Sequence, residues 1–169
     1  MKYEERLITV NGSTAVCHAY PRLGAVEETI DHSASLDIVQ KELKRLQESG
    51  LPQVIAIVGP SGSGKTVLAN VLAENSKNVE LINCFAKISN LNEFYKIPLS
   101  SCRVGKTYII DEVHYCDKLS LNDWLQKLMT KRGCVAILFV QCIDEFDLSI
   151  PFSEFTLSRS GLSIGNARV

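Results

Sequence analysis

The chain has 169 residues, of which 46% are hydrophobic and 22% charged, and its formal net charge is -1. This composition predicts one soluble globular domain with a full core, and the near-zero charge excludes a global basic field for nucleic acid, though not a local patch. Six cysteines without a Cys-x-x-Cys pair argue against a zinc site and favour reduced core thiols in the cytoplasm. The N-terminus has no signal-peptide core, and no apolar run is long enough to span a bilayer.

The first part of the chain contains two runs of strand-forming residues. Arg6–Val10 and Thr14–Tyr20 flank an Asn-Gly-Ser sequence, which is typical of a hairpin turn. We therefore predict that residues 1–32 form a β-hairpin that precedes the main domain and covers an edge of its core.

A helix is predicted over residues 33–49. Apolar residues recur there at helical spacing, and charged residues occupy the other face. Gly50 and then Pro52 end the helix. This helix opens the second unit, which we assign to residues 33–169.

The strongest pattern in the chain follows that helix. Val54–Val58 is an apolar strand, a glycine-rich turn comes directly after it, and Val67–Glu74 is typical of a helix. Strand, G-x-x-x-x-G-K-[ST] turn and helix together are the P-loop, which binds nucleotide phosphates. Its predicted phosphate-binding residues are Gly59, Pro60, Ser61, Gly62, Ser63, Gly64, Lys65 and Thr66.

Each residue type in this turn has a chemical reason. The glycines let successive backbone N–H groups curl around phosphate oxygens, and the positive end of the next helix adds to the attraction. Lys65 is expected to reach the β- and γ-phosphates, and the Thr66 hydroxyl to bind Mg²⁺. We therefore expect ATP and Mg²⁺ as cofactors.

A second chemical centre lies about forty-five residues further on. A core strand is expected over Val79–Phe85, followed by a segment of unclear structure with a short helix at Leu91–Tyr95. The apolar run 108–110 is then a strand that ends in Asp111 and Glu112. After a P-loop, Asp111 is expected to support Mg²⁺ near Thr66, and Glu112 to polarise an attacking water.

The remaining elements complete an α/β pattern. A helix is predicted over residues 117–130, a buried strand over Val135–Val140, and a strand over Glu154–Ser158, whereas the tail 159–169 shows no periodicity. Five strands joined by long connections indicate parallel pairing. The predicted fold is a three-layer α/β sandwich with a mostly parallel five-stranded sheet, plus the N-terminal hairpin and helix.

The sequence resembles the P-loop NTPases with a catalytic glutamate, and among them most closely the AAA+ ATPases. The similarity rests on GPSGSGKT at 59–66, YIIDE at 108–112 and VAILFVQ at 135–141. It implies that the third segment is a sensor strand between the other two strands, and that Gln141 contacts the γ-phosphate. Lys65, Glu112 and Gln141 are then the catalytic residues. The chain departs from the family in showing no helical lid and no arginine finger between residues 142 and 155.

Three other readings compete with a remodelling ATPase. Asp111-Glu112-Val113-His114 spells the DExH box of a helicase family, although one domain of this length holds only half of such an enzyme. A nucleotide-dependent binding switch would bind ATP and hydrolyse it rarely. A small P-loop kinase is the weakest reading, because kinases need an arginine-rich lid over the phosphates. For each reading a protein or nucleic-acid partner, or a second copy of the chain, is expected.

Overall fold

The computed structural model of the chain describes residues 4–10, 13–19, 29–31, 33–51, 53–158 and 161–168. Within these ranges the main sheet consists of β4 (Gln53–Val58), β5 (Val79–Asn83), β6 (Thr107–Asp111), β7 (Val135–Val140), β8 (Phe152–Ser158) and β9 (Gly161–Arg168). The helices are α1 (Ser33–Ser49), α2 (Lys65–Glu74), α3 (Cys84–Lys87) and α4 (Lys118–Met129), with short 3-10 turns η1 (Leu99–Ser101), η2 (Val113–Tyr115) and η3 (Asp144–Phe146). A separate small sheet consists of β1 (Glu4–Val10), β2 (Ser13–Ala19) and β3 (Thr29–Asp31).

The main sheet confirms the predicted fold class and corrects its strand count. Its order is β5-β6-β7-β4-β8-β9, and all neighbouring pairs are parallel except β8 with β9. The sixth strand, β9, comes from the tail in which no element was predicted. Its sequence contains two glycines, so its own strand propensity is weak. Pairing with the otherwise open edge of β8 supplies the stability that the local sequence lacks.

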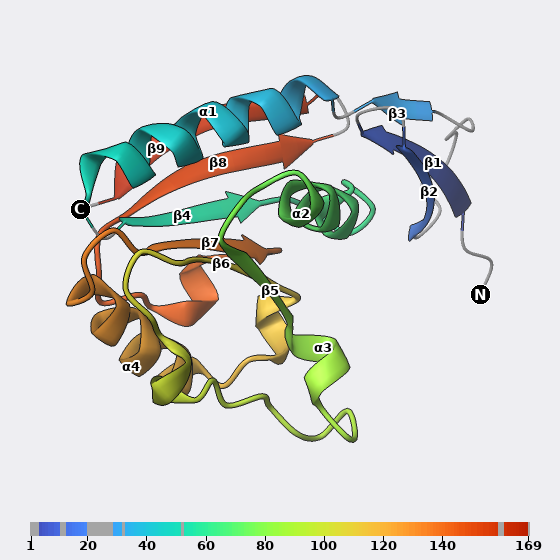
Figure 1. Cartoon of the computed structure of the whole chain (residues 1–169). Helices are drawn as coiled ribbons and strands as arrows, with labels where there is room; N and C mark the ends of the chain where they lie inside the picture. Colours follow the sequence, from blue (N-terminus) through green and yellow to red (C-terminus); the bar gives the residue numbers. More distant parts are fainter. Residues whose placement is uncertain are drawn as a thin grey trace.

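The three layers follow from the alternation of side chains along the strands. In Figure 1, α1 lies along one side of the sheet and α4 on the other. Ile55 and Ile57 of β4 pack in one cluster with α1 and α2, whereas Val54 and Ala56 pack in a second cluster with α4. Because both faces are covered, β6 and β7 are fully buried strands, as is expected of a central parallel sheet.

The α4 face fixes the strand that carries the predicted carboxylates. Trp124 of α4 lies edge-on to Tyr108 of β6, with ring centroids 5.1 Å apart, and both side chains are fully buried. Their polar atoms meet at η1: the Trp124 Nε1 donates to Ser101 Oγ, and the Tyr108 hydroxyl donates to the Ser101 carbonyl oxygen. The aromatic pair therefore anchors β6 without leaving a buried donor unpaired.

Helix boundaries agree with the sequence patterns where those patterns are local. α1 has the predicted bounds, and α4 begins after Asp117, whose side chain accepts from the Ser120 amide as an N-cap. The helix predicted at Leu91–Tyr95 is wrong, because Tyr95 instead forms an isolated parallel bridge with Cys116. The strand predicted over Val79–Phe85 ends early, at Asn83, because the Asn83 side chain caps α3.

The predicted hairpin is present as the antiparallel pair β1 and β2, and β3 adds a parallel third strand beside β1. Its predicted turn lies outside the described residues in part. Cys84, Cys102, Cys116 and Cys134 are buried free thiols, as expected, but Cys142 is exposed and the core role predicted for it is wrong. The Cys17 side chain lies outside the described part. No helix among the described residues is long and apolar enough to cross a membrane.

Candidate functional site

The predicted site residues come from the carboxyl ends of three neighbouring strands. β7 lies between β6 and β4, which is the position expected of the sensor strand. The amide of Gly59, directly after β4, donates to the carbonyl oxygen of Val140 at the end of β7. Asp111 and Glu112 follow β6 at the same edge. The topology therefore brings the P-loop and the carboxylate pair together, as in other open parallel sheets.

The P-loop has the backbone that its glycines predict. Gly62 and Gly64 have positive φ angles of 78° and 91°, a region that residues with a Cβ rarely adopt. α2 begins at Lys65, so its N-terminal amides face the loop. The Lys65 ammonium donates to the carbonyl oxygens of Gly59 (2.7 Å) and Pro60 (2.9 Å). These bonds hold the lysine folded over the loop.

Gly59 is required for a different reason from the other two glycines. Its φ is not positive, but a Cβ there would lie 2.6 Å from Ser63 Oγ and 2.7 Å from the Leu157 carbonyl oxygen. Sequence reasoning attributed this glycine to backbone freedom. The structure shows that close approach of β8 is the cause.

We expect Gly59→Ala to destabilise the nucleotide-free chain. Because one of the two contacts is backbone, the strain cannot be relieved by a rotamer change, and overpacking of this kind costs about 1–3 kcal/mol. In a chain of this size that lowers Tm by about 2–4 °C per kcal/mol in thermal unfolding. Ser61→Ala is the matched control, since Ser61 is exposed in the same loop and already carries a Cβ. A Tm equal to that of the wild type would show that β8 yields at this point.

Asp111 lies at the bottom of the site and is 1% exposed. Its Oδ1 accepts from the Glu112 amide at 2.9 Å, whereas Oδ2 is buried with no hydrogen-bond partner among the described residues. Burial raises the pKa of the carboxyl above its usual value, although the Thr66 hydroxyl and the Glu112 amide oppose the rise by favouring the charged form. A buried carboxylate oxygen beside a hydroxyl is a donor set that suits a hard cation such as Mg²⁺.

We expect Asp111→Asn to stabilise the nucleotide-free chain at neutral pH. The amide oxygen can still accept from Glu112 N, while the cost of a buried charge is removed, so Tm should rise by about 2–4 °C for a gain of about 1 kcal/mol. A carboxyl with a raised native pKa penalises the native state fully above that pKa, and the penalty disappears below the pKa of the unfolded chain. The difference in Tm should therefore shrink as the pH falls through the raised pKa. Asp123→Asn on the exposed face of α4 is the control, and a lower Tm in Asp111→Asn at neutral pH would contradict the argument.

Glu112 points away from the core, unlike the aspartate before it. Its backbone is left-handed, with φ 55° and ψ 46°, which is uncommon outside glycine and asparagine. The side chain is one-third exposed. Glu112 Oε1 lies 3.4 Å from Thr66 Oγ1, and Oε2 lies 3.5 Å from His114 Nε2. The Glu112 carboxylate thus contacts both the P-loop threonine and His114.

The sensing role predicted for Gln141 stays a prediction. The residue directly follows β7 and is exposed, next to the Val140 carbonyl that accepts from the P-loop. The His114 imidazole faces the Glu112 carboxylate, with Nε2 3.5 Å from Oε2. The DExH pattern at residues 111–114 was the feature of the sequence that could have indicated the contact between His114 and Glu112. No cluster of three or more metal-binding histidine, cysteine or acidic side chains occurs within the described ranges.

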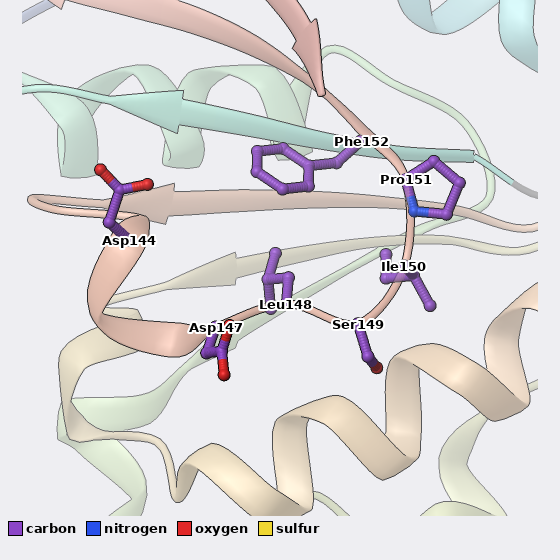
Figure 2. Close-up of a pocket in the computed structure, with 7 residues that line it drawn as sticks. All are labelled: Asp144, Asp147, Leu148, Ser149, Ile150, Pro151 and Phe152. Atoms are coloured by element: carbon purple, nitrogen blue, oxygen red, sulfur yellow. The ribbon is translucent and has the colours of Figure 1, made fainter. Parts of the chain in front are cut away.

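A hollow of about 320 Å³ lies elsewhere, beside the connection from η3 to β8 (Figure 2). None of the predicted site residues lines it. Its lining residues are Asp144, Asp147, Leu148, Ser149, Ile150, Pro151 and Phe152. We therefore locate the chemistry at the P-loop and treat the hollow as a feature of the α4 face.

Comparison with known proteins gives three findings. No curated protein matches the chain. Among solved structures, Saccharomyces cerevisiae Hsp104 in complex with ADP is 19% identical, with a TM-score of 0.39 over 62% of this chain and 25% of that chain. A Thermotoga maritima RuvB variant is 18% identical, with a TM-score of 0.38 over 65% of this chain and 39% of that chain. The chain thus spans less than two-fifths of either protein.

The family assignment comes from the sequence itself. The family model described as an AAA domain matches residues 51–140. This range contains the P-loop and the strand that ends in Asp111, and it covers more than half of the chain. The chain therefore belongs to the AAA domain family and has the P-loop ATPase core of that family.

Proposed function

We propose that the chain is an Mg²⁺-dependent ATPase in which water attacks the γ-phosphate in line, and that hydrolysis drives remodelling of a protein or nucleic-acid partner. The observation that carries this proposal is the 3.4 Å approach of Thr66 Oγ1 to Glu112 Oε1, next in sequence to the buried Asp111. The P-loop, the buried Asp111 carboxylate and the accessible Glu112 carboxylate then lie at the carboxyl ends of the strands of one sheet. That is the set of groups a hydrolytic P-loop site requires.

The P-loop would hold the nucleotide. Backbone amides between Gly59 and Thr66 would donate to phosphate oxygens, helped by the N-terminal end of α2. The Lys65 ammonium, which now donates to two loop carbonyls, would exchange those bonds for bonds to phosphate. The exchange replaces neutral carbonyl acceptors with anionic phosphate oxygens, so it favours the bound state.

The donor set fits Mg²⁺ beside the phosphates. Thr66 would contribute its hydroxyl, and Asp111 its buried Oδ2, directly or through a water. When bound, Mg²⁺ neutralises phosphate charge and helps to orient the reacting group. Occupation of the site would also relieve the cost of burying the Asp111 carboxylate.

Glu112 would orient and polarise the attacking water. Its left-handed backbone turns the side chain out of the sheet, so the carboxylate is one-third exposed and can meet a water, whereas that of Asp111 is buried. Gln141, at the end of the adjacent strand, would sense the γ-phosphate. Lys65, Glu112 and Gln141 are thus the proposed catalytic residues, each from a different strand end.

The arginine that completes such sites would come from outside the chain. The segment 142–155 contains no lysine or arginine. Since an arginine finger supplies about 10³–10⁵-fold in well-studied NTPases, we propose that a second copy of the chain or a partner in the cytoplasm stimulates turnover.

Release of inorganic phosphate from ATP by the purified chain tests the proposed function. We expect release with Mg²⁺, none after chelation, and stimulation when single- or double-stranded nucleic acid or rising protein concentration supplies the partner. Release that needs an added acceptor would indicate a kinase instead. Tight ATP binding without release under any condition would replace the ATPase with a nucleotide-dependent switch.

A further inference from the structure

Three aromatic rings run from solvent to the proposed catalytic carboxylate. The His114 ring packs on the Tyr115 ring, with centroids 4.2 Å apart, and the Tyr115 ring packs on Phe85 at 4.9 Å. His114 Nε2 in turn lies 3.5 Å from Glu112 Oε2. Phe85 is 49% exposed, so the outer end of this series faces water. Phe85 is thus connected through Tyr115 and His114 to Glu112, the residue proposed to polarise the attacking water.

The backbone beneath these rings is firmly held. Val113 and Cys116 of the η2 region are buried, and their backbones are joined by a hydrogen bond of 2.8 Å. The Tyr95 amide donates to the Tyr115 carbonyl oxygen, and the Asp117 amide donates to that of Tyr95. The turn therefore fixes the backbone positions of His114 and Tyr115, and ring packing fixes the orientations of their side chains.

Phe85 is positioned from the opposite side by the edge of the sheet. It belongs to α3, which follows β5 and contacts η2 (Figure 1). The N-cap of α3 is Asn83, which pairs in register with Asp111 on β6. One end of the ring series is thus tied to the strand that carries the carboxylates.

We propose that His114 is a positioning residue for Glu112, held in place by Tyr115 and Phe85, so that the exposed face of Phe85 is a control point for turnover. This inference rests on the proposed function. Within the part of the chain that the structure describes, the Glu112 carboxylate has polar contacts to Thr66 and to His114. Once Thr66 serves Mg²⁺, His114 is the contact that remains to fix the flexible glutamate side chain.

The contact between His114 and Glu112 contributes little to stability as an ion pair. The side chains of His114 and Glu112 are 41% and 33% exposed, and exposed pairs contribute about 0–1 kcal/mol. Geometry, by contrast, has a large effect on rate, since a misplacement of about 1 Å at a reacting group can cost about 100-fold. The contact therefore matters for where Glu112 lies and much less for stability.

The first test compares His114→Ala with His114→Gln in steady-state ATP hydrolysis. We expect His114→Ala to lower kcat by between about tenfold and a hundredfold with KM for ATP unchanged. His114→Gln should restore most of kcat, because its amide N–H can donate to Glu112 Oε2. Equal kcat in wild type and His114→Ala would overturn the inference. So would a loss that glutamine fails to restore, or a KM that rises in step, since either marks a purely structural role.

The second test addresses the outer end of the series. Phe85→Ala should lower kcat several-fold, whereas Phe94→Ala should not, because Phe94 is also exposed (60%) in the connection that follows α3 but belongs to no ring pair described above. Both replacements remove an exposed ring, so their effects on folding are comparable. Equal effects of the two variants would overturn the role of Phe85.

A third measurement does not depend on turnover. In nuclear magnetic resonance of the nucleotide-free chain, the His114 imidazole signals, assigned with His114→Gln, should shift on Glu112→Gln and on Phe85→Ala but not on Phe94→Ala. Unshifted signals would overturn the inference even if the chain hydrolyses ATP. If the wild type releases no phosphate but these shifts occur, the proposed function fails while the contact series stands.

Discussion

Glu112→Gln is expected to lower kcat for ATP hydrolysis by at least about 100-fold, the lower end of what general acid–base catalysis contributes. The glutamine has the same shape and can still accept from Thr66 Oγ1, which lies 3.4 Å from Glu112 Oε1. It lacks the negative charge that polarises water. ATP affinity should stay within a few-fold of the wild type, because the residue does not hold the phosphates. Single-turnover phosphate release and equilibrium ATP binding measure the two quantities separately.

Glu145→Gln is the matched control for this experiment. Glu145 is an exposed glutamate on η3, and the same change of charge there should leave kcat unchanged. If Glu112→Gln turned over at the wild-type rate, the water would be activated by another group. If it lost ATP binding as well, Glu112 would hold the nucleotide or its metal.

Lys65→Ala is expected to weaken ATP binding by about 100-fold or more. The Lys65 ammonium can donate to two phosphate oxygens, and each bond to a charged group contributes about 1.5–3 kcal/mol. Losing two such bonds corresponds to at least about two powers of ten in Kd. Isothermal titration with Mg-ATP measures the loss directly. A smaller rise of Tm with added nucleotide should accompany it, since ligand stabilisation follows affinity.

Two further variants test whether the loss of ATP affinity in Lys65→Ala is specific to this position and to a lysine side chain. Lys77→Ala removes an exposed lysine just after α2 and should leave ATP affinity unchanged. Lys65→Arg keeps the charge, but its planar fork cannot take the place of one compact ammonium between the β- and γ-phosphates, so binding should also fall. Wild-type affinity in Lys65→Ala would place the nucleotide away from this loop.

The sequence predicts those parts of the fold that are determined by short, continuous segments of the chain. The strand, the turn and the helix around Lys65 follow one another directly, so the pattern and its geometry agree. The fully buried β6 and β7 are apolar throughout, which marks central parallel strands. Asp111 ends β6, as the apolar run before it predicts, and its role at the metal stays a prediction.

The features that the sequence did not predict depend on distant partners. β9 forms on the edge of β8, and its glycine-containing sequence carries little signal of its own. Tyr95 is extended because it forms a parallel β-bridge with Cys116, some twenty residues later in the chain. His114 meets Glu112 only because Glu112 adopts a left-handed backbone, which no residue pattern announces. In the first two cases long-range packing outweighed local preference, and in the third a local backbone conformation did so.

The position of β4 in the sheet has a consequence for how the chain folds. β4 carries the P-loop, but its two partners are β7 and β8, which begin at Val135 and Phe152. Loop closure over such separations is entropically costly and slows folding. During synthesis, the loop at Lys65 would therefore leave the ribosome long before the strands that flank it. A nascent chain that ends before β8 should lack a nucleotide site although it contains every residue predicted to bind the phosphates, so nucleotide can stabilise this domain only after β8 has been made.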